Sequence, residues 1–146
     1  MSHIRTQLRG WLKTSLAGSS EAGSRVYVRR SLPLPEDLQP TILIAIQNEL
    51  SSDISMSGTQ RRGVAVRITL CAKGDAEATE DTLDELAVFI EGVLAADPTL
   101  GGLAETYEYQ STEFEFSGAG EKTLCTAALT FLVTLLTARD DPQNPL

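Results

Sequence analysis

Three carboxylates in the middle of the chain have the spacing of a metal site. Asp81, Asp84 and Glu85 occupy positions i, i+3 and i+4 of a helical pattern, so they lie close together on one helix. Oxygen ligands of this kind suit hard cations such as Mg²⁺, and a small metal-dependent nuclease or hydrolase is one hypothesis. No Lys or Arg occurs between Gly74 and Glu121 to serve as a catalytic partner. A solvated or interface-facing acidic surface is therefore the interpretation that we favour.

Histidine and cysteine offer little further chemistry. The single histidine, His3, stands beside the N-terminus, where a solvated side chain is expected. A Ser-His or Cys-His pair needs an internal histidine, and so does a metal site built from His and Cys. Cys71 and Cys125 lie in apolar strand-like runs and are expected to be small buried hydrophobes rather than a disulfide. The sequence predicts no catalytic residue, no bound metal and no cofactor, and hence no enzyme.

The charges are divided between the two parts of the chain. Thirteen acidic side chains lie between Gly74 and Glu121, whereas the first thirty residues hold six bases and one acid. Opposite poles on one molecule can pair between copies, and head-to-tail contacts of this kind can close into rings. The alternatives are that the poles meet within one monomer or are merely solvated. The candidate ring-interface residues are Arg25, Arg29, Arg30, Glu77, Glu80, Asp81, Asp84 and Glu85.

Length and composition are those of one ordinary domain. The 146 residues suffice for a hydrophobic core without metal or disulfide support. The net charge of −8 argues against tight binding to nucleic-acid phosphates. No stretch approaches the roughly 20 apolar residues of a membrane span, and no signal peptide is recognisable. We expect a cytoplasmic domain over residues 1–138 and a disordered tail over 139–146.

Hydrophobic periodicity predicts an α+β fold. Ser2 is a plausible N-cap for a helix that ends at Gly18, with Arg5, Arg9 and Lys13 forming a positive stripe along it. The other predicted elements are strands at Arg25–Arg30, Thr41–Gln47 and Arg61–Lys73, a helix at Asp75–Ala96, and a hairpin formed by Thr106–Phe116 and Lys122–Thr137. This order indicates an antiparallel or mixed sheet of about five strands with two helices packed on one side.

Two details refine this pattern. The aromatic residues of the first hairpin arm change parity between Gln110 and Glu113, which predicts a bulge or kink there. Asn48–Gln60 is polar and serine-rich, so we expect a long mobile loop. Ile54 and Met56 are the only sizeable apolar residues in its middle, and they are candidates for contact with a partner.

Several short motifs together resemble a known family. The opening I-R-x-x-L-R-x-W-L is followed by R-V-Y-V-R-R, and L-D-E-L-A-x-x-I-E-x-x-L is followed by A-D-P-T-L-G-G-L-A and T-E-F-E-F-S-G-A-G-E-K. From about Ile4 to Thr137 the chain resembles the tail terminator proteins of long-tailed phages and prophages, the relatives of the lambda minor tail protein U. Each motif is a core pattern or a turn and carries no chemical signature.

The resemblance implies a structural protein of the virion tail, assembled in the host cytoplasm. Members of this family form hexameric rings that cap the tail tube, stop its polymerisation and offer the surface that joins the head. The implied partners are further copies of the chain, the tail tube protein and a head completion or connector protein. DNA would pass through the ring without specific binding. Ile54 and Met56 become tube-contact candidates, and no motif marks the residues of the lumen. A dimeric binding module remains a further alternative.

Overall fold

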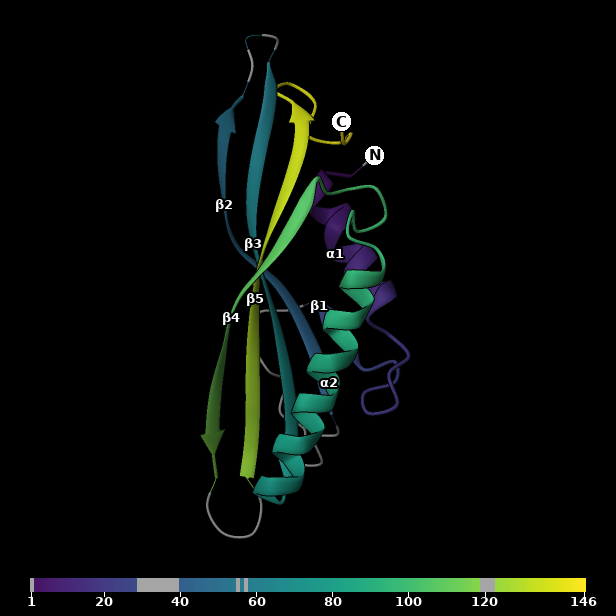
Figure 1. Cartoon of the computed structure of the whole chain (residues 1–146), viewed down its shortest axis with the longest axis vertical. Coiled ribbons are helices and arrows are strands. Elements are labelled where there is room, and N and C mark those ends of the chain that lie inside the picture. Colours follow the sequence, from purple (N-terminus) through teal and green to yellow (C-terminus); the bar gives the residue numbers. More distant parts are fainter. Residues whose placement is uncertain (1, 29–39, 55, 57, 119–122) are drawn as a thin grey trace.

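A computed structural model of the chain describes residues 2–28, 40–54, 56, 58–118 and 123–146. The elements follow the order α1 (Ile4–Ser15), β1 (Val26–Val28), β2 (Thr41–Asp53), β3 (Thr59–Gly74), α2 (Ala76–Ala96), β4 (Thr106–Ser117) and β5 (Thr123–Ala138). The strands form one sheet in the order β1-β2-β3-β5-β4. β1 runs parallel to β2, and the other pairs are antiparallel. Figure 1 shows both helices on the same side of this sheet, so the predicted mixed α+β fold is confirmed.

The core lies between the sheet and the two helices. Alternate residues of the central strands are buried because successive side chains of a strand point to opposite faces. The core face of β3 and β5 carries Val64, Val66, Ile68, Leu70, Leu129, Phe131, Val133 and Leu135. The helices contribute Ile4, Leu8, Leu12, Leu83, Leu86, Ile90 and Leu94. On the opposite face Leu43 and Cys71 form a small second cluster with Leu124, which agrees with the two-sided apolar pattern of the strand at Thr41–Gln47.

The first helix begins one residue later than predicted. His3, not Ser2, is the N-cap, and its Nδ1 accepts a hydrogen bond from the backbone N–H of Arg5 at 3.1 Å. The imidazole is therefore partly buried and structural rather than simply solvated. Burial and the nearby Arg5 and Arg62 guanidinium groups lower the pKa of His3 below its usual 6.5. Neutral histidine is the form that this cap requires, since a protonated Nδ1 cannot accept.

The predicted loop at Asn48–Gln60 is wrong for most of its length. β2 continues to Asp53 and β3 begins at Thr59, and the register pairs Asn48 with Ala65 and Asp53 with Gln60. The hairpin projects beyond both helices, as the top of Figure 1 shows. Side chains outside the helical layer need no apolar alternation, so a polar sequence forms strands here as readily as a loop.

The C-terminal residues fold back instead of forming the expected disordered tail. The backbone N–H of Ile4 donates to the carbonyl oxygen of Pro142 at 2.7 Å, and Leu146 N–H donates to Leu136 O at 2.9 Å. The Gln7 side chain donates to Gln143 O at 2.6 Å. These bonds use main-chain groups of the tail, which a composition argument does not detect. The C-terminal segment therefore packs against the first turns of α1.

The glycine turn that follows α2 packs against α1. The Asp97 carboxylate accepts hydrogen bonds from the Thr99 hydroxyl at 3.1 Å and from the Gly101 backbone N–H at 3.0 Å. Gly101 has a φ of +74°, and a Cβ at this position would lie 2.5 Å from the indole of Trp11 on α1. Only glycine leaves room for this contact. Trp11 and the A-D-P-T-L-G-G-L-A turn, which belong to separate motifs in the sequence, thus contact each other directly.

Candidate functional site

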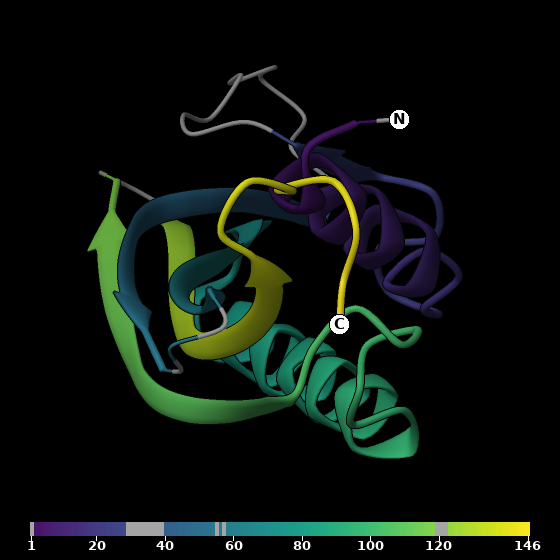
Figure 2. The same cartoon turned by 90° about the horizontal axis from the view of Figure 1, so that it is seen from above.

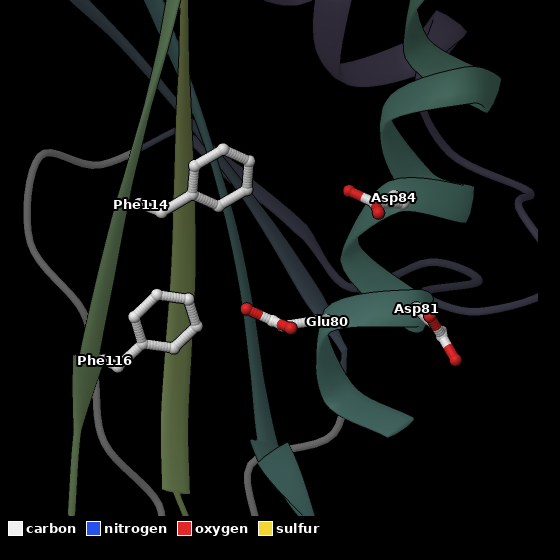
Figure 3. Close-up of a pocket in the computed structure, with 5 residues that line it drawn as sticks. All are labelled: Glu80, Asp81, Asp84, Phe114 and Phe116. Carbon is white, nitrogen blue, oxygen red and sulfur yellow. The ribbon is translucent and has the colours of Figure 1, made fainter. Parts of the chain in front are cut away.

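An open groove of about 320 Å³ lies between α2 and the edge strand β4. Glu80, Asp81 and Asp84 border it on the helix, and Phe114 and Phe116 border it on the strand. Figure 3 shows the carboxylates of Glu80 and Asp84 directed towards the two phenyl rings, whereas Asp81 points away from them. Each ring is 52% exposed, an unusually large apolar surface to leave on the inner face of a sheet.

The groove exists because α2 is too narrow to cover all the strands on its side. α2 packs on β3 and β5, and β4 lies beyond the helix at the edge of the sheet. The register of β4 shifts between Tyr109 and Ser111, which confirms the predicted bulge. Because of this shift, Tyr109 pairs with Phe131 and Phe114 pairs with Ala127, both core-facing residues of β5. The bulge therefore places aromatic residues of opposite sequence parity on one face.

The electrostatics of the groove are strongly negative. Among the described residues, no Lys or Arg forms an ion pair with Glu80 or Asp84. The pKa of the nearby Cys125 thiol is raised by burial and then by the negative charge of Glu80. Two carboxylates one helical turn apart, next to two exposed phenyl faces, would attract a cation that carries an apolar stem.

The structure divides the predicted acidic interface residues into two flanks of α2. Glu80 and Asp84 face β4, whereas Asp81, at the border of the groove, directs its carboxylate away from the phenyl rings (Figure 3). Glu85 follows Asp81 by one turn and is also exposed, as is Glu77 near the start of the helix. Asp81 and Asp84 thus diverge, and no group of three metal-ligating side chains is gathered anywhere in the described ranges. The sequence spacing i, i+3 did not distinguish the two flanks.

The predicted basic partners are placed differently from the acids. Arg25 is engaged within its own chain, since its guanidinium donates to Pro40 O at 2.9 Å and to Glu21 O at 2.8 Å. Arg29 and Arg30 lie outside the described residues. Two cations on α1 remain available: neither Arg9 nor Lys13 lies within ion-pair distance of a carboxylate in the part of the chain that the structure describes. Their spacing along the helix was visible in the sequence.

A second exposed feature is the tip of the β2–β3 hairpin. Met56 is fully exposed, Ile54 is 39% exposed and Leu50 on the same arm is 78% exposed. Ile54 N–H donates to Thr59 O at 3.0 Å, so the hairpin closes through its own backbone. Three apolar side chains are thus displayed on an ordered projection. Leu50 was not singled out from the sequence, because only the strand pairing shows that it belongs to the same projection.

A cluster of charges anchors this hairpin at its base. The Glu49 carboxylate accepts hydrogen bonds from Arg62 at 3.0 Å and from Arg5 of α1 at 3.1 Å. The Arg62 Nε also donates to the Thr137 hydroxyl of β5 at 3.0 Å. Burial alone would raise the pKa of Glu49, but the Ser51 hydroxyl and the two guanidinium groups outweigh it, and the pKa is lowered. The hairpin is therefore tied to α1 and β5 at once.

Comparisons with known proteins do not assign a family to this chain. No protein-family model matches the chain, and no curated protein matches it. Among solved structures, it is similar to a chain of the particle described as "Virion of native gene transfer agent (GTA) particle", with a TM-score of 0.38 and 12% identity over 90% of this chain and 92% of that chain. A similarity of this size does not assign a function. Within the described ranges, no helix combines the length and hydropathy needed to cross a bilayer.

Proposed function

We propose that this chain is a structural virion protein that terminates a phage-like tail. Six copies close into a ring on the end of the tail tube, stop its growth and present the surface to which the head binds. The protein works as a component of the virion tail, assembled in the host cytoplasm, and has no catalytic role.

The observation that carries this proposal is the placement of opposite charge at opposite edges of one sheet. α1 packs on β1 and β2 at one edge, and the acidic groove lies against β4 at the other edge. Figure 2 shows α1 across the molecule from β4. A surface on one edge that complements a surface on the opposite edge favours a head-to-tail contact, and such contacts close into rings when the rotation allows. The motifs from Ile4 to Thr137 that resemble tail terminators support the same role.

The hairpin is the part of the ring that we assign to the tail tube. Ile54 and Met56 form an exposed apolar tip, and Leu50 extends it along β2. The tip needs little ordering on contact because its strands are already paired, and preorganisation lowers the cost of binding. This role replaces the expectation of a loop that orders only on assembly.

The proposal is tested at the level of the particle. Removal of the gene from the genome that encodes it should give tail tubes of unregulated length and heads without tails, seen by negative-stain electron microscopy. Tubes of normal length joined to heads would contradict the proposal. Native mass spectrometry of the purified protein should detect six copies, whereas a dimeric binding module would give one or two.

The tip assignment has a test of its own. Ile54→Ser with Met56→Ser should leave folding and ring size unchanged but reproduce the long-tube phenotype, because both side chains are exposed and neither supports the core. Leu146→Ser is the matched control, since Leu146 is 69% exposed but lies at the C-terminus. Normal virions from the double variant would exclude the tip from the tube interface.

A further inference from the structure

The groove between α2 and β4 has the chemistry of a receptor for paired basic side chains. Its helix side offers Glu80 and Asp84, which lie one turn apart, and its strand side offers the half-exposed rings of Phe114 and Phe116 (Figure 3). An Arg or Lys side chain has an apolar stem and a cationic head, so it can lie along the rings and place its charge at the carboxylates. A purely apolar ligand would leave the carboxylates desolvated, and a phosphate would be repelled.

The α1 surface supplies a matching pair. Arg9 and Lys13 are also one helical turn apart, which separates their Cβ atoms by about 6 Å, the same spacing as Glu80 and Asp84. The Arg9 guanidinium donates to the Thr6 hydroxyl of its own helix at 3.2 Å, and Lys13 is exposed. Gly10 lies beside them on the helix surface; it has nothing within 4 Å of its Cβ position and allows close approach.

Other cations of the described chain fit less well. Arg5, Arg62 and Arg139 are paired with carboxylates of their own chain. Arg67 and Lys73 lie on β3, in the interior of the strand order, and not on a helix at the edge of the sheet. Arg9 and Lys13 are thus the described pair that combines spacing, exposure and position at the opposite edge.

We propose that the α2–β4 groove of one copy binds Arg9 and Lys13 on α1 of the next copy. This inference rests on the proposed ring and names the contact that closes it. It also explains why Phe114 and Phe116 remain uncovered in the single chain: their cover is the α1 surface of a neighbour. Glu85, which does not line the groove, stays outside the contact.

Complementary charge reversal tests the contact. In the groove variant, Glu80→Lys and Asp84→Lys make the groove positive; in the helix variant, Arg9→Glu and Lys13→Glu make α1 negative. Each variant alone should lose self-association by about tenfold or more in sedimentation velocity, because every contact then joins like charges. An equimolar mixture should recover association, since each groove again meets an α1 of opposite sign. Alternation of two kinds of copy can close a ring of six, because six is even.

The control is Glu85→Lys, compared with Glu80→Lys alone: it reverses one charge on the same helix, but Glu85 is exposed and does not line the groove, so association should stay intact. Circular dichroism verifies that every variant folds. Rings that persist in both reversed variants, or a mixture that fails to recover, would overturn the contact while leaving the ring itself standing. A wild-type chain that stays monomeric at every attainable concentration and in the assembled tail would overturn the contact as well. The gene-removal phenotype reports on the proposed function independently of these outcomes.

Discussion

Replacement of Glu49 by alanine should destabilise the protein strongly, although most of the hairpin that contains Glu49 is exposed. The change leaves Arg62, whose side chain is only 9% exposed, without the carboxylate at 3.0 Å. Removing one partner of a buried ion pair costs roughly 3–5 kcal/mol. The second partner, Arg5, is 39% exposed and adds only about 0–1 kcal/mol. Since Arg62 keeps its bond to Thr137, we expect a loss of about 3 kcal/mol.

Urea unfolding followed by Trp11 fluorescence and circular dichroism measures this loss. With a slope of about 2 kcal/mol per molar urea, a loss of about 3 kcal/mol lowers the midpoint by about 1.5 M. Asp53→Ala is the matched control in the same hairpin. It breaks the Asp53–Arg139 pair, whose atoms are 2.8 Å apart but whose side chains are 50% and 52% exposed, and should cost about 0–1 kcal/mol.

The pH dependence of the free energy of unfolding separates the charge contribution of Glu49 from its packing contribution. The pKa of Glu49 is lowered in the folded protein, so its stabilisation is complete above the unfolded pKa and is lost as the pH falls through the folded value. The difference between wild type and Glu49→Gln should therefore be constant above about pH 5 and shrink in more acidic solution. Equal effects of Glu49→Ala and Asp53→Ala, or a difference that does not change with pH, would refute the ion-pair account.

Two further predictions concern the N-terminal helix and its contacts. Gly101→Ala should lower the free energy of unfolding by about 2–4 kcal/mol, because the new Cβ overlaps the Trp11 indole at a positive φ. Gly102→Ala is the control and should cost about 1–2 kcal/mol, since Gly102 has a φ of +82° but open space around it. Equal costs of the two variants in urea unfolding would show that the Trp11 contact is not the cause. The single imidazole, His3, should titrate below pH 6.5 in an NMR experiment, since burial and two guanidinium groups disfavour its charged form; a value at or above 6.5 would show that it does not cap α1 as a neutral group.

The local pattern of apolar residues in the sequence was sufficient to predict much of the fold. The alternation of Val64, Val66, Ile68 and Leu70 identified the buried face of β3, and the stripe Leu83, Leu86 and Ile90 identified the core face of α2. The parity change in β4 predicted its bulge. These features depend on residues that are neighbours along the chain, so periodicity in the sequence reports them directly.

The hairpin and the tail depended on contacts that are remote in sequence. Asn48–Asp53 is a strand because β3 lies beside it with the right register, and Arg139–Leu146 is ordered because its backbone bonds to α1 and β5. Neither segment buries an alternating apolar set, so hydrophobic pattern could not identify its structure.

The candidate site shows the same division between sequence and tertiary structure. Charge asymmetry along the chain predicted an acidic helix and a basic N-terminal segment as opposing surfaces. Only the folded chain shows that Arg25 is occupied by main-chain oxygens, and that Glu80 and Asp84 face Phe114 and Phe116 while Asp81 points elsewhere. Which flank of a helix meets an edge strand is set by how far the helix covers the sheet. That coverage follows from the packing of α2 on β3 and β5, a relation that no local spacing contains.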